Sequence, residues 1–130
     1  MTPRQPITSS SAPAAIGPYS QAIEANGLIF CSGQLGLDPV TGQKVAGGVA
    51  AETRRALENL KAVLTAAGSS LDQVVRTSVY LTDLSEFQTL NAVYAEFFPS
   101  PAPARTTLQV AALPKQGCVE IDAIALRQAP

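Results

Sequence analysis

The sequence contains no histidine and no tryptophan, and only two of its 130 residues are cysteines. Without an imidazole there is no histidine base, no serine–histidine or cysteine–histidine pair and no histidine-ligated metal. Cys31 and Cys118 are 87 positions apart, a spacing that suits neither a metal site nor a redox pair. Both lie in apolar runs, so we expect reduced, buried thiols in a cytosolic protein, although a disulfide between strands remains open.

Charged residues are also scarce. They make up 15% of the chain, where a typical soluble domain has about 25%, and the formal net charge is −1. The basic residues are scattered and give no electrostatic footprint for nucleic acid, so we expect no nucleic-acid partner. Because few polar side chains are available to cover the outside, we expect some apolar surface to be shared with another subunit.

Long hydrophobic segments are missing too. No apolar run approaches the length of about 18 residues that a membrane span needs, and residues 1–15 lack the apolar core of a signal peptide. We therefore expect a cytoplasmic protein with no membrane partner. We interpret the start of the chain, about residues 1–6, as a leader that is either mobile or paired as a strand.

The first element that the sequence predicts is a β-hairpin around residues 26 and 27. Both residues of Asn26-Gly27 accept positive φ, which favours a tight turn between a strand over 20–25 and an apolar strand that starts at residue 28 and ends over 32–34. Pro and Gly predict a further turn over 38–42.

Helical spacing predicts one helix between Gly47-Gly48 and a C-terminal cap at Gly68. A second helix is expected to start over 83–85, with Ser85 and Gln88 as a capping box and an inward stripe rich in aromatic residues. Further strands are expected over 74–81, around Arg105 and over 118–126. This order predicts one α+β domain over residues 1–130, a single mixed β-sheet with two helices packed on one face and a second copy of the chain against the other face.

Two charged side chains are the main candidates for chemistry. Arg105 begins an apolar strand, and its planar, forked guanidinium can hold a carboxylate through two hydrogen bonds. The alternative is a structural arginine paired with a nearby acid. Glu120 has apolar neighbours in the last strand, where desolvation would favour its neutral form and bring its pKa into a useful acid–base range. The alternative is a solvated edge acid, an interpretation that suits Asp122 better.

Two uncharged residues are weaker candidates. Gly33 would let a ligand or another backbone come close, or it would be part of an ordinary turn that ends a strand. Asn91 is a polar residue within the aromatic stripe of the second helix. It is either a hydrogen-bonded core amide or a residue of the site.

A hairpin between the last two strands would separate the two charged candidates. Ala112 would then face Cys118 and Glu120 would face Val110, which would leave Arg105 about 16 Å from Glu120. One small ligand could not touch both side chains within one chain. The assumed pairing therefore predicts a site that needs Glu120 from a neighbouring chain.

Five motifs in this order resemble the Rid family, the reactive intermediate deaminases also called YjgF. They are Ala15-Ile16-Gly17-Pro18-Tyr19-Ser20-Gln21-Ala22, Ser32-Gly33-Gln34, residues 91–98, Pro103-Ala104-Arg105-Thr106-Thr107 and residues 119–125. The resemblance, which runs from about residue 7 to the end, implies a chorismate-mutase-like subunit, a homotrimer with a central barrel and ligand clefts between subunits. It also implies hydrolysis of short 2-imino acids, formed from their enamine tautomers, to 2-oxo acids and ammonia without a metal or cofactor.

The resemblance also implies roles for residues at matching positions. Arg105 would bind the substrate carboxylate, Glu120 would activate water and move protons, and Tyr19 would line the cleft. The other substrate-binding positions would be Ser32, Gly33, Asn91 and the backbone at Thr107. Some members of the family have cysteine at the position of Thr107, so thiol chemistry there is not expected in this chain.

Two other functions stay open from the sequence. One is a trimer that binds a small ligand or acts like a chaperone without turnover, which the low surface charge would suit. The other is an endoribonuclease or translation inhibitor, a label attached to parts of the family. The lack of histidine and of a basic patch speaks against ribonuclease activity.

Overall fold

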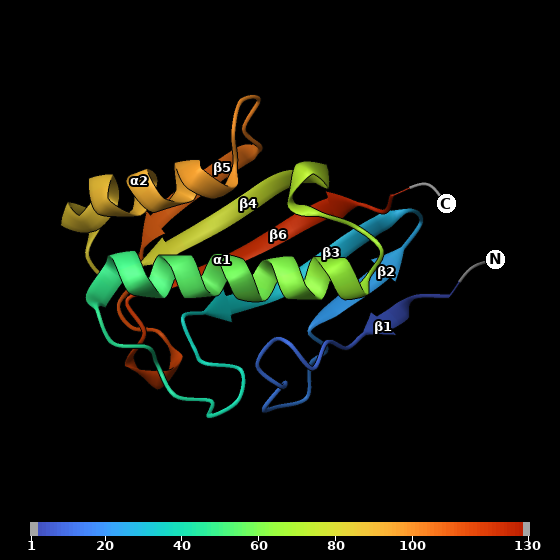
Figure 1. Ribbon diagram of the computed structural model, residues 1–130, viewed down its shortest axis with the longest axis horizontal. Helices are drawn as coiled ribbons and strands as arrows, with labels where there is room; N and C mark the ends of the chain where they lie inside the picture. The colour runs from blue at the N-terminus through green and yellow to red at the C-terminus, as the bar shows by residue number, and fades with distance from the viewer. Residues whose placement is uncertain (1–2, 129–130) are drawn as a thin grey trace.

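The computed structural model describes residues 3–128 and consists of one six-stranded sheet with two helices on one of its faces (Figure 1). The sheet order is β1-β2-β3-β6-β4-β5, and every pairing is antiparallel except the parallel pair β4–β5. The α+β class, the single mixed sheet and the placement of both helices on one face are confirmed. The elements are β1 Gln5–Ile7, β2 Ala22–Ala25, β3 Leu28–Leu35, α1 Gly48–Ala66, β4 Val74–Leu81, α2 Phe87–Phe97, β5 Ala104–Gln109 and β6 Val119–Leu126.

The N-terminal segment is paired as a strand where the structure describes it. Gln5–Ile7 forms β1 and pairs antiparallel with β2. The β2–β3 hairpin also forms as predicted, with Asn26 at φ 52° and Gly27 at φ 78° in its turn. Residues 1 and 2 of the expected leader, like residues 129 and 130, lie outside the described part of the chain.

The apolar stripe of α1 packs on the sheet and supplies much of the core. Ala56, Leu57, Leu60, Val63 and Leu64 are fully buried against β3 and β6. The helix ends as predicted. The residue after its cap is Gly68, at φ 74°, and the amides of residues 68 and 69 donate to the carbonyls of residues 65 and 64, the pattern of a Schellman motif.

The predicted capping box at the second helix is wrong. Ser85 lies inside a short 3-10 turn, η2, Leu84–Glu86, that precedes α2. Asp83 is the capping residue, because its carboxylate accepts a hydrogen bond from Ser85 N at 2.9 Å. A box with Ser85 as the N-cap would start the helix at residue 86, whereas α2 starts at Phe87, directly after η2.

The predicted hairpin between the last two strands is also wrong. β6 lies between β3 and β4, while β5 pairs with β4 in parallel, with α2 as the connection between them. The expected facing pairs Ala112/Cys118 and Glu120/Val110 do not exist, so the distance derived from them does not hold. Glu120 instead pairs with Leu35 on one side and Tyr80 on the other.

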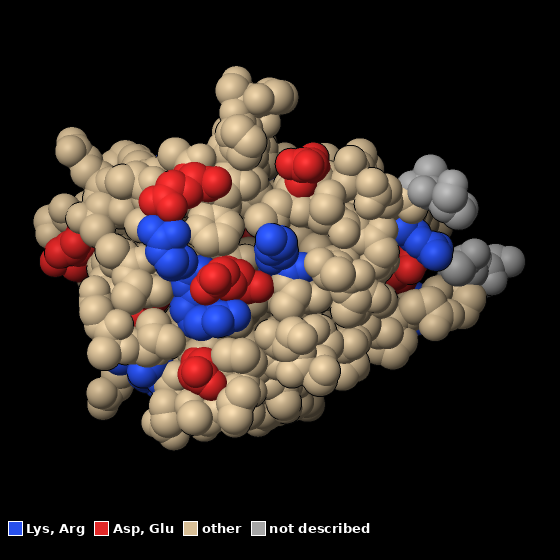
Figure 2. Space-filling view, viewed as in Figure 1, with Lys and Arg blue, Asp and Glu red and all other residues tan. Residues whose placement is uncertain are grey.

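Helices α1 and α2 pack on one face of the sheet, and the other face is open. The helix-covered face is closed, and charged residues of both signs are interspersed over α1 and α2 (Figure 2). Arg54 of α1 and Glu96 of α2 form a two-pronged ion pair with distances of 2.9 and 3.1 Å. On the other face, the large apolar side chains Phe30, Leu108 and Leu126 are exposed by 42%, 50% and 45%.

No described helix is long and apolar enough to span a bilayer.

Candidate active site

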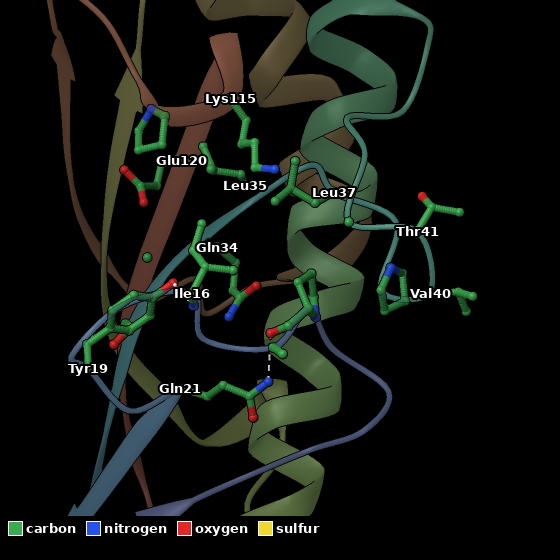
Figure 3. A pocket seen from close by; sticks show the side chains of 17 residues that line it. Ile16, Tyr19, Gln21, Gln34, Leu35, Leu37, Val40, Thr41, Lys115 and Glu120 are labelled. Carbon is green, nitrogen blue, oxygen red and sulfur yellow. Dashed lines mark hydrogen bonds between the residues drawn. The ribbon is translucent and has the colours of Figure 1, made fainter.

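A cavity of about 600 Å³ lies where β3 meets the N-terminal segment and the loop before β6 (Figure 3). Four of the predicted site residues line it together: Tyr19, Ser32, Gly33 and Glu120. They come from three separate segments of the chain. The other lining residues are Pro13, Ala14, Ile16, Gln21, Gln34, Leu35, Leu37, Pro39, Val40, Thr41, Gly42, Pro114 and Lys115.

Gly33 lies directly against Glu120. A β-carbon at Gly33 would come within 2.6 Å of Glu120 Oε2 and 2.8 Å of its carboxyl carbon, so only glycine leaves the carboxylate where it is. The strand does not end over 32–34 as predicted. β3 continues to Leu35, with an irregularity between Cys31 and Gln34 that changes the register against β6. Gly33 therefore serves a close side-chain approach within a strand, not a strand-ending turn.

The carboxyl group of Glu120 is half-buried. Burial raises its pKa above the ordinary value of 4.5, and the negative charge of Asp122 raises it further. Asp122 itself accepts a hydrogen bond from the Tyr80 hydroxyl at 3.1 Å. The predicted upward shift and its main cause, desolvation, are confirmed. A carboxyl group of this kind exchanges protons closer to neutral pH than an exposed glutamate does.

The turn that carries Tyr19 is fastened to β3. Ser32 Oγ donates a hydrogen bond to Ser20 O at 2.6 Å, and Ser32 N donates to Gln21 O at 2.9 Å. In the turn itself, Tyr19 N donates to Gly17 O at 2.8 Å. The aromatic ring of Tyr19 thereby reaches the cavity on the same side as Glu120 (Figure 3). In this chain Ser32 positions the tyrosine turn, and its oxygen keeps lone pairs that a ligand could use.

The other lining residues were not predicted as parts of a site, and two of them, Gln21 and Lys115, bring polar groups to it. Gln21 is 4% exposed, and its side-chain amide accepts from Ser9 N at 2.6 Å and donates to Pro13 O at 2.8 Å. It holds the N-terminal segment over the cavity. Lys115 adds a cation to the lining from the loop before β6. Gln21 lies within the first of the five motifs, but no role was expected for it, and Lys115 lies in none of them.

Arg105 lies elsewhere, under α2. Its Nη2 donates to Asn91 Oδ1 at 2.8 Å, and its guanidinium carbon lies 4.7 Å from the ring centre of Tyr94 and 5.5 Å from that of Phe87. Within residues 3–128, no carboxylate lies within 4.0 Å of it. Within the described residues, Arg105 is therefore not the structural arginine paired with a nearby acid that the alternative predicted. Asn91 contacts the guanidinium and is half-buried, so it is not a core amide.

The two charged candidates lie on opposite faces of the sheet. Arg105 stacks on Tyr94 of α2 and so lies on the helix-covered face. Glu120 alternates along β6 with Val119 and Ile121, which are fully buried on that covered face, so Glu120 lies on the open one. One protomer does not bring the two groups to a common ligand.

Comparison with known proteins gives the family. Residues 9–127 match a family model described as Endoribonuclease L-PSP. A Bos taurus protein named 2-iminobutanoate/2-iminopropanoate deaminase is 52% identical over 124 residues, which cover 95% of this chain and 90% of the bovine one. The chain belongs to the Rid family. The resemblance noted in its five motifs is confirmed.

Two solved structures share the fold closely. RidA from an Antarctic Psychrobacter is 48% identical, with a TM-score of 0.91 over 94% of this chain and 98% of that one. E. coli TdcF with bound serine is 42% identical, with a TM-score of 0.90 over 95% and 99%. The YjgF-type subunit expected from the resemblance is thus the fold of this Rid chain.

Thr107, the remaining candidate, lies on β5 two residues after Arg105 and pairs with Val79 of β4. It belongs with Asn91 and Arg105 in a second group of predicted site residues, apart from the cavity.

Both cysteines are free, and burial raises the pKa of the Cys31 thiol to about 12. The expected burial holds for Cys31, whereas Cys118 is only half-buried. Among residues 3–128, no three cysteine or acidic side chains cluster in a way that could hold a metal ion.

Proposed function

We propose that this Rid protein is an imine deaminase that hydrolyses 2-iminobutanoate, 2-iminopropanoate and similar short 2-imino acids. Water adds across the C=N bond, the carbon–nitrogen bond then breaks, and the products are a 2-oxo acid and ammonia. Several relatives that are about half identical to this chain over most of its length carry that activity in their names. The proposed reaction needs no metal or cofactor, since it exchanges only water and protons.

The observation that carries this proposal is the placement of Glu120. Its half-buried carboxyl group, with a raised pKa, faces a cavity large enough for a small metabolite. As a carboxylate it can take a proton from the attacking water, and as an acid it can return that proton to the departing nitrogen. Imines of this kind already hydrolyse in water, so orientation and one proton relay supply the modest acceleration required.

We propose further that the site is shared between two copies of the chain. Glu120, Tyr19, Ser32 and Gly33 form one half on the open face of the sheet. Arg105 of the neighbouring copy, with its Asn91 and the backbone of its Thr107, supplies the carboxylate-binding half.

The charge of Arg105 and the exposed apolar residues support this arrangement. Its guanidinium has no acidic partner among the described residues of its own chain, which leaves its fork available to a substrate carboxylate. Phe30, Leu108 and Leu126 form the apolar surface that a homotrimer with a central barrel would bury. TdcF, a close structural neighbour, was crystallised with serine, which also carries a carboxylate.

We place this activity in the cytoplasm, with the imine as the partner molecule and no nucleic acid or membrane surface involved. The rival functions make different predictions in the same assay. A chaperone-like or ligand-binding trimer would not accelerate the formation of a 2-oxo acid. A ribonuclease, which the name of the family model suggests, would cleave RNA and leave the imine untouched.

The test is a steady-state assay with 2-iminopropanoate or 2-iminobutanoate generated in situ by an amino-acid oxidase. We expect the 2-oxo acid and ammonia to form faster than the spontaneous rate, and Glu120→Gln to remove most of the acceleration. Asp72→Asn, which changes an exposed acid in the turn before β4, is the matched control and should behave like the wild type. A wild-type rate equal to the spontaneous one would overturn the proposal.

A further inference from the structure

A buried carboxylate on α1 lies behind one wall of the cavity. The side chain of Glu52 is 1% exposed, and its Oε1 accepts a hydrogen bond from Cys118 N at 2.8 Å. Its Oε2 lies 4.0 Å from Lys44 Nζ, and that ammonium donates to Gln116 O at 3.0 Å. Glu52 and Lys44, called here the carboxylate clamp, thus hold the loop before β6 at two points.

The loop that the clamp holds has a strained backbone. Lys115 and Gln116 are consecutive non-glycine residues at φ 59° and 58°, in the left-handed region that side chains disfavour. The turn is closed by Gly117 N, which donates to Pro114 O at 3.0 Å. Such a conformation persists only where its surroundings hold it, and here the contacts of the clamp fall directly on and after the strained pair.

Glu52 also lies close to the end of β3, the strand that pairs with β6 at Glu120. A β-carbon at Gly36, which follows β3, would lie 2.5 Å from Glu52 Cα, so α1 and this end of β3 are in close contact. The preceding residue, Leu35, pairs with Glu120. On β6, Glu120 follows the clamped Cys118 by two positions. Glu52 therefore contacts the backbone on both sides of the proposed catalytic carboxyl group, through its carboxylate at Cys118 and through its own backbone at Gly36.

A carboxylate in this position is costly for stability alone. Burying an ionised group disfavours folding unless its partners compensate, and apolar residues of similar size often stabilise as well or better. The carboxylate of Glu52 contacts Cys118 N and Lys44, and both of these contacts hold the loop that supplies Pro114 and Lys115 to the cavity wall. We infer that Glu52 is a positioning residue for imine hydrolysis, which sets the place of Glu120 and of the cavity wall at Lys115. This inference rests on the proposed function.

The first test compares three substitutions on α1 in the full-length protein. In Glu52→Ala we expect kcat to fall by about tenfold or more while KM stays within about twofold, because the reacting groups are misplaced but the carboxylate-binding half is intact. Glu52→Gln keeps an oxygen that can accept from Cys118 N and should recover most of the loss. Glu58→Ala, an exposed residue of the same helix that lies 3.6 Å from Arg55, should match the wild type.

A second readout does not depend on activity. Amide hydrogen exchange at Cys118 should be faster in Glu52→Ala than in the wild type, and unchanged in Glu58→Ala. If Glu52→Ala does not fold, Lys44→Met tests the clamp from its partly exposed side and should also lower kcat. Wild-type kcat in the folded variants, or a loss that only follows the unfolded fraction seen in thermal denaturation, would overturn the inference. A wild type without deaminase activity would refute the proposed function, while unchanged Cys118 exchange would refute the clamp itself.

Discussion

Gly33 and Glu120 are in contact so close that any side chain at position 33 would displace the carboxylate, since a β-carbon on Gly33 would lie 2.6 Å from Glu120 Oε2. The atoms that block it are the flexible end of the glutamate side chain, so the strand can accept alanine by displacing the carboxylate. We therefore expect Gly33→Ala to fold and to lower kcat by about tenfold or more. Added to Glu120→Gln, the same substitution should have little further effect, and an additive loss would contradict this explanation.

Replacing Arg105 by lysine keeps the charge and removes the fork. A two-pronged grip on a carboxylate contributes roughly 1.5 to 3 kcal/mol, so we expect kcat/KM to fall by about tenfold or more in Arg105→Lys. Steady-state kinetics with 2-iminopropanoate measures this. Arg54→Lys, which alters the surface ion pair with Glu96, is the control. A wild-type kcat/KM in Arg105→Lys would remove Arg105 from the site.

Mixing two inactive variants tests whether the site is shared. In a mixed trimer of Arg105→Ala and Glu120→Gln chains, an interface regains both groups when the first chain supplies Glu120 and the second supplies Arg105. Random exchange of equal amounts should restore about a quarter of wild-type activity. The variants are mixed under conditions that exchange subunits and then assayed. Absence of recovery despite demonstrated exchange would mean that both groups act within one chain.

The pH dependence should report the pair Glu120 and Asp122. Because the pKa of Glu120 is raised, the carboxylate that activates water is lost, and the rate falls, as the pH drops through a value above the ordinary 4.5. Asp122→Asn removes the neighbouring negative charge and should therefore lower this pKa and move the acid limb of kcat/KM to lower pH. The asparagine oxygen can still accept from Tyr80. Asp72→Asn should leave the profile in place, and an unmoved limb in Asp122→Asn would contradict the assignment.

Much of the fold could be predicted because local patterns and the tertiary structure agree. The Asn26-Gly27 turn, the apolar stripe that ends before Gly68 and the strand over 74–81 each depend on neighbouring residues, and each is confirmed. Strand order does not depend on neighbours in the same way. The insertion of β6 between β3 and β4 is a long-range pairing, which is why adjacent strands were wrongly joined as a hairpin.

The site could be predicted only in part for the same reason. Glu120 stood out as an acid within an apolar strand, and its raised pKa follows from that burial. That Gly33 lies against it could not be read from the chain, because the contact joins strands almost ninety positions apart. Gln21 and Glu52 were missed because a buried polar side chain has no signature until its partners are known.

The three hydrogen bonds of Gln21 to residues 9 and 13 make the first part of the chain a component of the cavity. Removing this serine- and proline-rich stretch would take Pro13 and Ala14 out of the cavity lining and leave the buried side chain of Gln21 without its partners. A shortened chain should therefore keep the residues from β1 onward if the cavity is to stay closed on this side.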